Sequence, residues 1–458
     1  MFEEKNIPES TKYETFTQEE YMVMKDDLLR PIEKIGKAGK IWIAFLTAVF
    51  LAGVFAYYFQ ESRGKYVTTG LRDYTMWGIY ISNFLFLVAL SLTSVFMSAI
   101  LKLTNFEWYR PLSRIADVIS LSSITMAGIC IMISMGRPDR LHFLFIHGRI
   151  QSPIVWDIIV VATYFVACVL MLFVALIPSL STCKNHLHHL PKWQLRMDDL
   201  LSFGWEGTAD QWKILKKTVL ILTVLVIPLG IALRTVSAWL FSTTLRPEWD
   251  STNFGAYFVS GSALLTVAVM IIAVYAFRKT YKLEKYLTEM HFDKLGQAMV
   301  LMGLIYAYFN INEYLVPAYK MSSLHANHLL NLFVGEDALF YWSVVFFGIV
   351  VPSIFPLFKK IRKPLSLTVI AFAVLIAGWF KFYLIVIPGL SHPLLPIQDV
   401  PASWEQYAPS LVEMTIVAAT IAGTMLIVTV FSRYFPIISV WEVAEGKLEG
   451  KEEIINYK

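Results

Sequence analysis

The chain has 458 residues, of which 56% are hydrophobic and only 16% charged, with a formal net charge of +4. Soluble domains carry about a quarter charged residues, so this composition argues against a soluble domain. The basic residues are scattered among polar links and form no patch, which gives no sign of nucleic-acid binding. Its three cysteines have no paired spacing, which argues against a disulfide framework or a cysteine metal site.

Ten apolar runs are long enough to cross a membrane as helices, each of which needs about 20 residues. The sequence therefore predicts an all-α integral membrane protein with about ten transmembrane helices. We expect an N-terminal arm (1–39), spans one to five (40–245), spans six to ten (246–435) and a C-terminal tail (436–458). The runs lie at about 41–60, 77–101, 115–135, 153–180, 218–241, 255–277, 296–318, 338–358, 365–389 and 410–435.

The N-terminal arm is polar and charged without an apolar central stretch, so no cleavable signal peptide is expected. Residues 13–35 are compatible with an amphipathic helix at the membrane face and also with a disordered tail.

The distribution of Lys and Arg among the links predicts the orientation. The links after spans four, six and eight are rich in basic residues, at 184–216, 278–285 and 359–363. The links after spans five, seven and nine contain only Arg246, only Lys320 and no basic residue, respectively. Arginines in the links after spans one and three weaken this bias without reversing it. We therefore expect both termini to be cytoplasmic.

The segment 135–157, MGRPDRLHFLFIHGRIQSPIVWD, combines three Arg, two His and two Asp between apolar runs. Asp157 stands at the mouth of span four, and an ionisable group at that depth is a candidate for a functional site. His142 suits a quinone head group, which needs a hydrogen-bond donor and a group that exchanges protons near neutral pH. A solvated loop position for His142 is the simpler alternative.

Other ionisable or amide side chains lie within the spans, where each is costly in lipid. A proton path, a transported solute or polar ties between helices would each explain them. No histidine lies inside a span, so a haem with intramembrane axial ligands is not expected, and no iron–sulfur, nucleotide or metal motif occurs. We therefore expect no redox cofactor or metal in this chain. The main residues of this set are Asp117, Arg234, Asn310, Glu313, Lys381 and Glu413.

Several motifs resemble those of the NrfD/PsrC family, the polysulfide-reductase-like membrane subunits. They are WGIYISNFLF at 77–86, YRPLSRIAD at 109–117 and GRPDRLHFLF with SPIVWD between 136 and 157. Further motifs are similar to one branch, the ActC and ActF subunits of alternative complex III. These are GWEGTADQWKILKK at 204–217, RPEWDSTNFGAYFVSGS at 246–262, HFDKLGQAMVLMGLIYAYFNINEYLVPAY at 291–319 and SRYFPIISVWEV at 432–443.

The resemblance implies two four-helix bundles, spans two to five and six to nine, with outer helices completing the set. It also implies a subunit in a prokaryotic cell membrane that exchanges electrons with the quinone pool, quinol being a bound substrate. The expected partners are an iron–sulfur or molybdopterin-type subunit on the outer face, cytochrome subunits and a second subunit of the same family.

The family's functional positions can be carried over to individual residues. His142 and Asp157, together with Arg137, match positions at the quinone head group, whereas Asp117, Asn310 and Glu313 match positions on a proposed proton route. Arg234 and Lys381 stand where the branch carries different ionisable residues, so proton translocation does not follow from the likeness.

Two alternative functions stay open at this point. A secondary transporter would also have ten spans with buried charges, and Pro228 and Pro352 could mark broken helices. A structural anchor with a degenerate quinone pocket is the other. Purification would distinguish a transporter from an oxidoreductase subunit. A transporter should be isolated alone, whereas an oxidoreductase subunit should be isolated with its partners.

Overall fold

Every element of the described chain is helical in the computed structural model. The structure describes residues 18–33, 36–72, 75–104, 106–187, 190–244, 246, 249–320, 323–391 and 407–445. Within these residues, 10 helices are long and apolar enough to cross a membrane. The predicted all-α integral membrane fold is therefore confirmed.

The spanning helices extend beyond the apolar runs where their first turns are polar. The fifth span, for example, begins at Ala209 rather than near 218, because Thr208 and Gln211 form a capping box that satisfies the free N–H groups. The spans are α2 (Lys37–Arg63), α4 (Ile79–Ser91) continued by η2 and α5 to Leu103, α6 (Ser113–Ser134), α8 (Pro153–His186), α10 (Ala209–Ser242), α11 (Phe254–Tyr281), α12 (Glu289–Lys320), α14 (Ala338–Val345) continued by η5, α15 and η6 to Leu357, α16 (Pro364–Val386) and α18 (Leu411–Tyr434).

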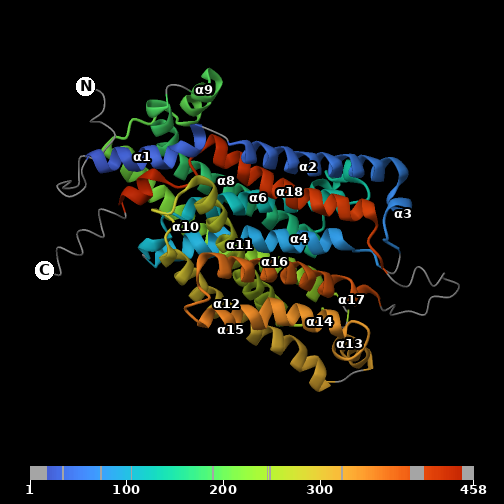
Figure 1. Ribbon diagram of the computed structural model, residues 1–458. Helices are drawn as coiled ribbons and strands as arrows, with labels where there is room; N and C mark the ends of the chain where they lie inside the picture. Colours follow the sequence, from blue (N-terminus) through green and yellow to red (C-terminus); the bar gives the residue numbers. More distant parts are fainter. Residues whose placement is uncertain are drawn as a thin grey trace.

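The helices form two bundles of four, as the motifs implied. Helices α4, α6, α8 and α10 pack together in the first bundle, and α11, α12, α14–α15 and α16 in the second. The bundles meet where α11 contacts α4 and α10 and where α16 contacts α4. Helices α2 and α18, the first and last spans, lie side by side and cover the first bundle at α6 (Figure 1).

The two ends of the helix array carry different short helices (Figure 1). Helices α1 (Gln18–Glu33) and α9 (Lys192–Leu201) lie at one end, here called the α1 end. Helices α3 (Lys65–Thr68), α13 (Ser323–Phe333) and α17 (Pro388–Ser391) lie at the opposite end, the α13 end. Because the spans alternate in direction, the link between α6 and α8, which contains α7 (Phe143–Ile146), also lies at the α13 end.

Helix α1 is the described part of the arm for which an amphipathic helix was considered. Its apolar residues Met24, Leu28, Leu29 and Ile32 recur at helical spacing and are buried. The helix contacts α18. Residues 13–17, 34 and 35 of the expected segment lie outside the described residues.

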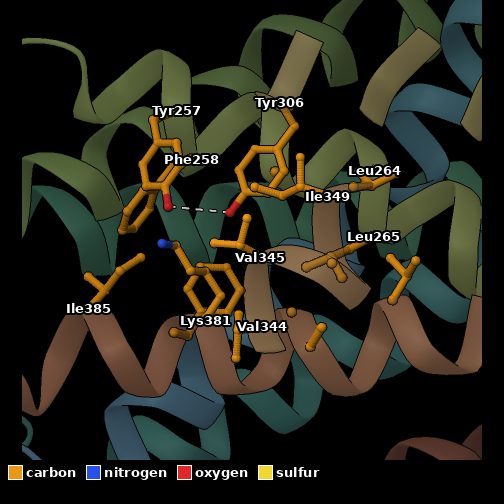
Figure 2. Close-up of a pocket in the computed structure, with 16 residues that line it drawn as sticks. Tyr257, Phe258, Leu264, Leu265, Tyr306, Val344, Val345, Ile349, Lys381 and Ile385 are labelled. Atoms are coloured by element: carbon orange, nitrogen blue, oxygen red, sulfur yellow. Dashed lines mark hydrogen bonds between the residues drawn. The ribbon is translucent and has the colours of Figure 1, made fainter. Parts of the chain in front are cut away.

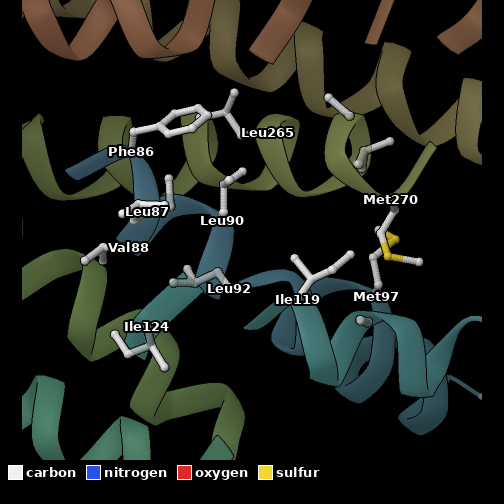
Figure 3. Packing of buried hydrophobic residues seen from close by; sticks show 14 of the residues in the cluster. Phe86, Leu87, Val88, Leu90, Leu92, Met97, Ile119, Ile124, Leu265 and Met270 are labelled. Atoms are coloured by element: carbon white, nitrogen blue, oxygen red, sulfur yellow. The ribbon is translucent and has the colours of Figure 1, made fainter. Parts of the chain in front are cut away.

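Apolar side chains fill the junction between the bundles. Figure 3 shows Phe86 of α4 against Leu265 of α11, and Met97 beside Met270; all four are buried. Polar ties also cross this region, since the buried Asn83 amide donates to Thr420 of α18 at 2.8 Å and accepts from the Trp379 indole of α16 at 3.2 Å. Such bonds join helices in an apolar environment, where apolar side chains alone drive association weakly.

Candidate functional site

Asp157 lies in the second turn of α8 at the α13 end, and only 3% of its surface is exposed. The hydroxyl of Ser237 on α10 donates a hydrogen bond to its Oδ1 at 2.6 Å. In the described structure this carboxylate accepts a hydrogen bond from one side chain only. It can therefore still accept a hydrogen bond or a proton from another group. This arrangement makes Asp157 a candidate proton acceptor near a membrane surface.

Arg234 stands one helical turn before Ser237 and is fully buried. Its Nε donates to the carbonyl oxygen of Phe258 at 3.2 Å and its Nη1 to that of Leu85 at 3.1 Å, so it joins α10 to α11 and α4. The guanidinium also lies 4.5 Å from the ring centre of Phe258 and 4.8 Å from that of Phe382. Such cation–π contacts are strongest where water is excluded. Arg234 therefore connects the helix that holds Ser237 with the second bundle.

The other two residues of the expected quinone site lie on the surface. His142 is exposed, and its ring contacts that of Phe143 edge-on, with centroids 4.4 Å apart. Arg137 is exposed and binds Asp139 through two hydrogen bonds of 3.1 and 3.0 Å, which lower the pKa of that carboxyl. Within the described structure, neither His142 nor Arg137 contacts Asp157 through a hydrogen bond or ion pair. The structure thus places the three residues at one end without joining them.

Large apolar side chains are exposed in the same segment as His142. Phe145, Ile146 and Ile150 expose 74%, 67% and 81% of their surfaces, and Phe143 is also exposed. Contiguous exposed apolar groups of this size are characteristic of interaction surfaces. We call the segment 142–150 with these side chains the α7 rim.

A second polar cluster surrounds Lys381 inside the second bundle (Figure 2). The Lys381 side chain rises from α16 toward the hydroxyls of Tyr257 and Tyr306. Its Nζ donates to the hydroxyl of Tyr314 at 2.8 Å and lies 4.9 and 5.0 Å from the ring centres of Tyr314 and Tyr341. The ammonium is therefore held by aromatic faces and a phenol oxygen.

Hydrogen bonds continue from this cluster toward the α13 end. Tyr306 donates to the Tyr257 hydroxyl, and Tyr257 donates to Oδ1 of Asn310, each at 3.3 Å. One turn further along α12, Glu313 accepts from Ser251 at 2.9 Å and from Asn253 at 3.3 Å. The structure thus gathers Asn310, Glu313 and Lys381 into one polar region, and Phe258 and Phe382 separate it from Arg234.

Two cavities adjoin this region. The smaller, of about 30 Å³, is lined by Tyr306, Lys381 and the rings of Phe258 and Phe382. The larger, of about 150 Å³, lies at the α13 end, where Glu313 forms part of its wall. Both are lined by Tyr257 and Ile385. The larger cavity has room for several water molecules at about 30 Å³ each.

The remaining two ionisable residues lie away from both clusters. Asp117, near the α1 end of α6, accepts a hydrogen bond from Ser94. Glu413 is the third residue of α18 and forms a capping box with Ser410. It also accepts from the backbone N–H of Gly70 at 2.8 Å and from the Tyr407 hydroxyl at 2.7 Å. This geometry gives Glu413 a structural role that joins the start of α18 to the loop after α3.

Sequence reasoning missed the tyrosines and the serine that complete these clusters. Tyr257, Tyr306, Tyr314 and Tyr341 all belong to the second bundle. A tyrosine inside an apolar span needs a partner for its hydroxyl, and their concentration in three spans was the available signal. Ser237 offered no comparable signal, because serine is common in membrane helices.

Comparison with known proteins identifies related chains. The sequence model of the family described as "Polysulphide reductase, NrfD" matches residues 67–393. This match covers well over half of the chain and confirms the family expected from the motifs.

Relatives match along almost their whole length. A putative membrane subunit of dimethyl sulfoxide reductase from Halobacterium salinarum is 24% identical, over 89% of this chain and 94% of the relative. The menaquinone reductase integral membrane subunit of Nitratidesulfovibrio vulgaris is 20% identical, over 87% and 91%. The Hdr-like menaquinol oxidoreductase integral membrane subunit of Archaeoglobus fulgidus is 23% identical, over 88% and 95%.

Proposed function

Because the chain belongs to the NrfD polysulphide reductase family, we propose that it is the quinone-interacting membrane subunit of a multi-subunit respiratory oxidoreductase. The named relatives support this proposal, since all three are membrane subunits of oxidoreductases and two names specify menaquinone or menaquinol. Among the complexes that contain such subunits, the motif likeness favours alternative complex III.

The observation that carries the proposal is the buried Asp157 carboxylate behind the exposed loop 135–152. Oxidation of a quinol to a quinone releases two electrons and two protons, so the site needs an acceptor for each. Asp157, oriented by Ser237 at 2.6 Å, is proposed to accept one proton, and the second proton is proposed to pass to water at the exposed loop. His142 is proposed to hydrogen-bond the head group, with Arg137 beside it. Because both are exposed in the isolated chain, the pocket is completed when a partner covers the loop.

The α7 rim is the proposed docking surface for that partner. Phe145, Ile146 and Ile150 in this rim expose 67% to 81% of their surfaces, and exposed apolar groups of this size are common at interaction sites. The electrons are proposed to leave to an iron–sulfur cluster of a molybdopterin-type or related subunit at this end. Cytochrome subunits and a second chain of the same family are the further proposed partners.

We place the α1 end in the cytoplasm and the α13 end outside, in the cell membrane of a prokaryote. The support is the excess of Lys and Arg in the links at the α1 end. The proposed quinol site then faces outward, and protons released there leave on the outer side.

A polar route through the second bundle is a further part of the proposal. Lys381, Asn310 and Glu313 are proposed to form a route to the cavity at the α13 end, whereas the rings of Phe258 and Phe382 separate Arg234 from them. Asp117 belongs to the opposite half of the first bundle, and the contacts of Glu413 are those of a helix cap.

Substitution of Asp157 by Asn in the intact complex tests the assignment. We expect quinol oxidation to fall at least tenfold while the complex keeps all of its subunits, because the amide cannot accept the proton. The matched control is Glu336→Gln, which changes an exposed carboxylate at the same end of the helix array. Normal turnover in Asp157→Asn would remove Asp157 from the mechanism, and isolation of the chain without partners would favour a transporter.

A further inference from the structure

The two bundles share a feature in the link between their second and third spans. In the first bundle this link carries the short helix α7 with His142 before it and His147 after it. In the second bundle the equivalent link carries α13, which contains His325 and His328. Both links lie at the α13 end. The first link leaves His142 exposed, whereas α13 folds against α12 and α14.

Helix α13 encloses the larger cavity together with the end of α12 and the start of α11. His325 and His328 line it from α13, and Glu313 lines it from α12. Its volume of about 150 Å³ equals that of an engineered protein cavity that binds one benzene ring. Aromatic and aliphatic side chains form a further part of its wall, among them Phe254, Tyr314 and Leu329. The cavity can therefore hold a single six-membered ring.

Polar groups reach the cavity from separate elements. Glu313 is 6% exposed, and both hydrogen bonds that it accepts in the described structure, from Ser251 and Asn253, reach Oε2. Its Oε1 is thus available to a hydroxyl donor. His325 contacts Asp250 at 3.3 Å, and the polar residues Ser251, Asn253 and Asn312 also line the cavity. A ring with hydroxyl or carbonyl groups finds complementary partners here.

The charges of the cavity wall favour a neutral ring over the phosphate of a lipid head group. Glu313 and Asp250 are two carboxylates, and Lys320 is the fixed positive charge among the described lining residues. A phosphate would face repulsion from both carboxylates and would lack the cluster of basic donors that it requires. A neutral diol or dione meets no such repulsion.

We propose that the cavity between α12, α13 and the start of α11 is a second binding site for a quinone-class head group, separate from the Asp157 site. The choice of quinone as the ligand rests on the proposed function, because that function makes quinone available in the surrounding membrane. The site binds the head group, and no electron transfer is assigned to it. In this proposal the apolar tail of the quinone leaves the cavity over Val316, a lining residue that exposes 53% of its surface.

Photolabelling of the intact purified complex with an azido-quinone, followed by peptide mapping, tests this proposal. We expect labelled peptides both around 142–157 and around 250–257 or 313–332. Glu313→Gln should reduce the second label at least fivefold and leave the first unchanged. The amide oxygen would still accept from Ser251 and Asn253, so the amide nitrogen would replace Oε1 and could not accept a hydrogen bond from the ring hydroxyl. The control Glu336→Gln alters an exposed carboxylate at the same end and should change neither label.

A second variant protects the test against poor assembly of Glu313→Gln. Leu329→Trp should fill the cavity and remove the second label, since Leu329 lines the cavity and is 6% exposed. Asp157→Asn should weaken only the first label.

The pattern of labelling distinguishes failure of the second site from failure of the proposed function. Label near Asp157 alone overturns the second site and keeps the proposed function. Label at the cavity alone supports the second site and removes the Asp157 assignment, whereas no label at either place overturns both. Phospholipid that remains in the cavity in the presence of excess azido-quinone also overturns the second site.

Discussion

The hydroxyl of Ser237 donates a hydrogen bond of 2.6 Å to the buried carboxylate of Asp157, across the contact between α10 and α8. This bond fixes the orientation of Asp157. It also connects the proposed proton acceptor to α10, the helix on which Arg234 lies one turn before Ser237. The Ser237 hydroxyl therefore holds the Asp157 carboxylate against α10.

Replacing Ser237 by Ala should slow quinol oxidation by roughly ten- to a hundredfold, because a hydrogen bond to a charged group is worth about 1.5–3 kcal/mol. Ser237→Thr keeps the hydroxyl and should retain most of the activity. Steady-state rates of the purified complex with a short-chain quinol provide the measurement. Equal losses in the two variants would show that packing at this position, rather than the hydrogen bond, is what matters.

Arg234→Met should destabilise the chain, since it removes the two hydrogen bonds that join α10 to α4 and α11. A hydrogen bond from a charged group is worth roughly 1.5–3 kcal/mol, and the ring contacts with Phe258 and Phe382 are lost as well. We expect a melting temperature lower by several degrees in detergent. Arg149→Met, at an exposed loop position, is the control and should melt like the unchanged protein. An unaltered melting temperature in Arg234→Met would contradict the structural role.

The spans and the buried charges could be predicted from sequence, because lipid imposes a minimum apolar length and a high cost on each ionisable group. Asp157, Arg234 and Lys381 are all buried in the structure, as their places in the spans indicated. Their partners could not be predicted. The carbonyl of Leu85, which holds Arg234, belongs to a span 149 residues earlier and has no side-chain signature.

The surroundings of the histidines were equally hidden from the sequence. His142 and His328 both lie in polar links beside apolar residues. Only the packing of α13 against α12 and α14 places His328 at a cavity, whereas α7 leaves His142 on the surface. A single sequence does not specify how a link folds back on its bundle.

Glu413 offers a test of a structural role against a catalytic one. Glutamine also serves at the third position of a capping box, so Glu413→Gln should keep near-normal stability and turnover. Glu413→Ala should lower stability by roughly 1–2 kcal/mol, since it removes the partner of the Gly70 and Ser410 N–H groups. Thermal unfolding and quinol oxidation should be measured on both. Lost turnover with normal unfolding in Glu413→Gln would place Glu413 on a proton route.

Asp198 provides a pH-dependent prediction outside the membrane spans. It lies on α9, is 1% exposed, and neither carboxylate oxygen has a hydrogen-bond partner in the described structure. Burial raises its pKa to about 7, whereas an unfolded chain gives Asp a pKa of about 4. Between these values the folded state binds more protons than the unfolded state, so stability falls as the pH rises and levels off above about pH 7.

Asp198→Asn should remove this part of the pH dependence, because the amide does not ionise. The variant should gain a few degrees in melting temperature relative to the unchanged protein at about pH 8 and little at about pH 5. Asp199→Asn is the matched control, since its neighbour Asp199 is exposed and paired with Lys184 at 2.5 Å. If Asp198→Asn and the unchanged protein lose the same number of degrees between the two pH values, the buried Asp198 carboxyl does not titrate in this range.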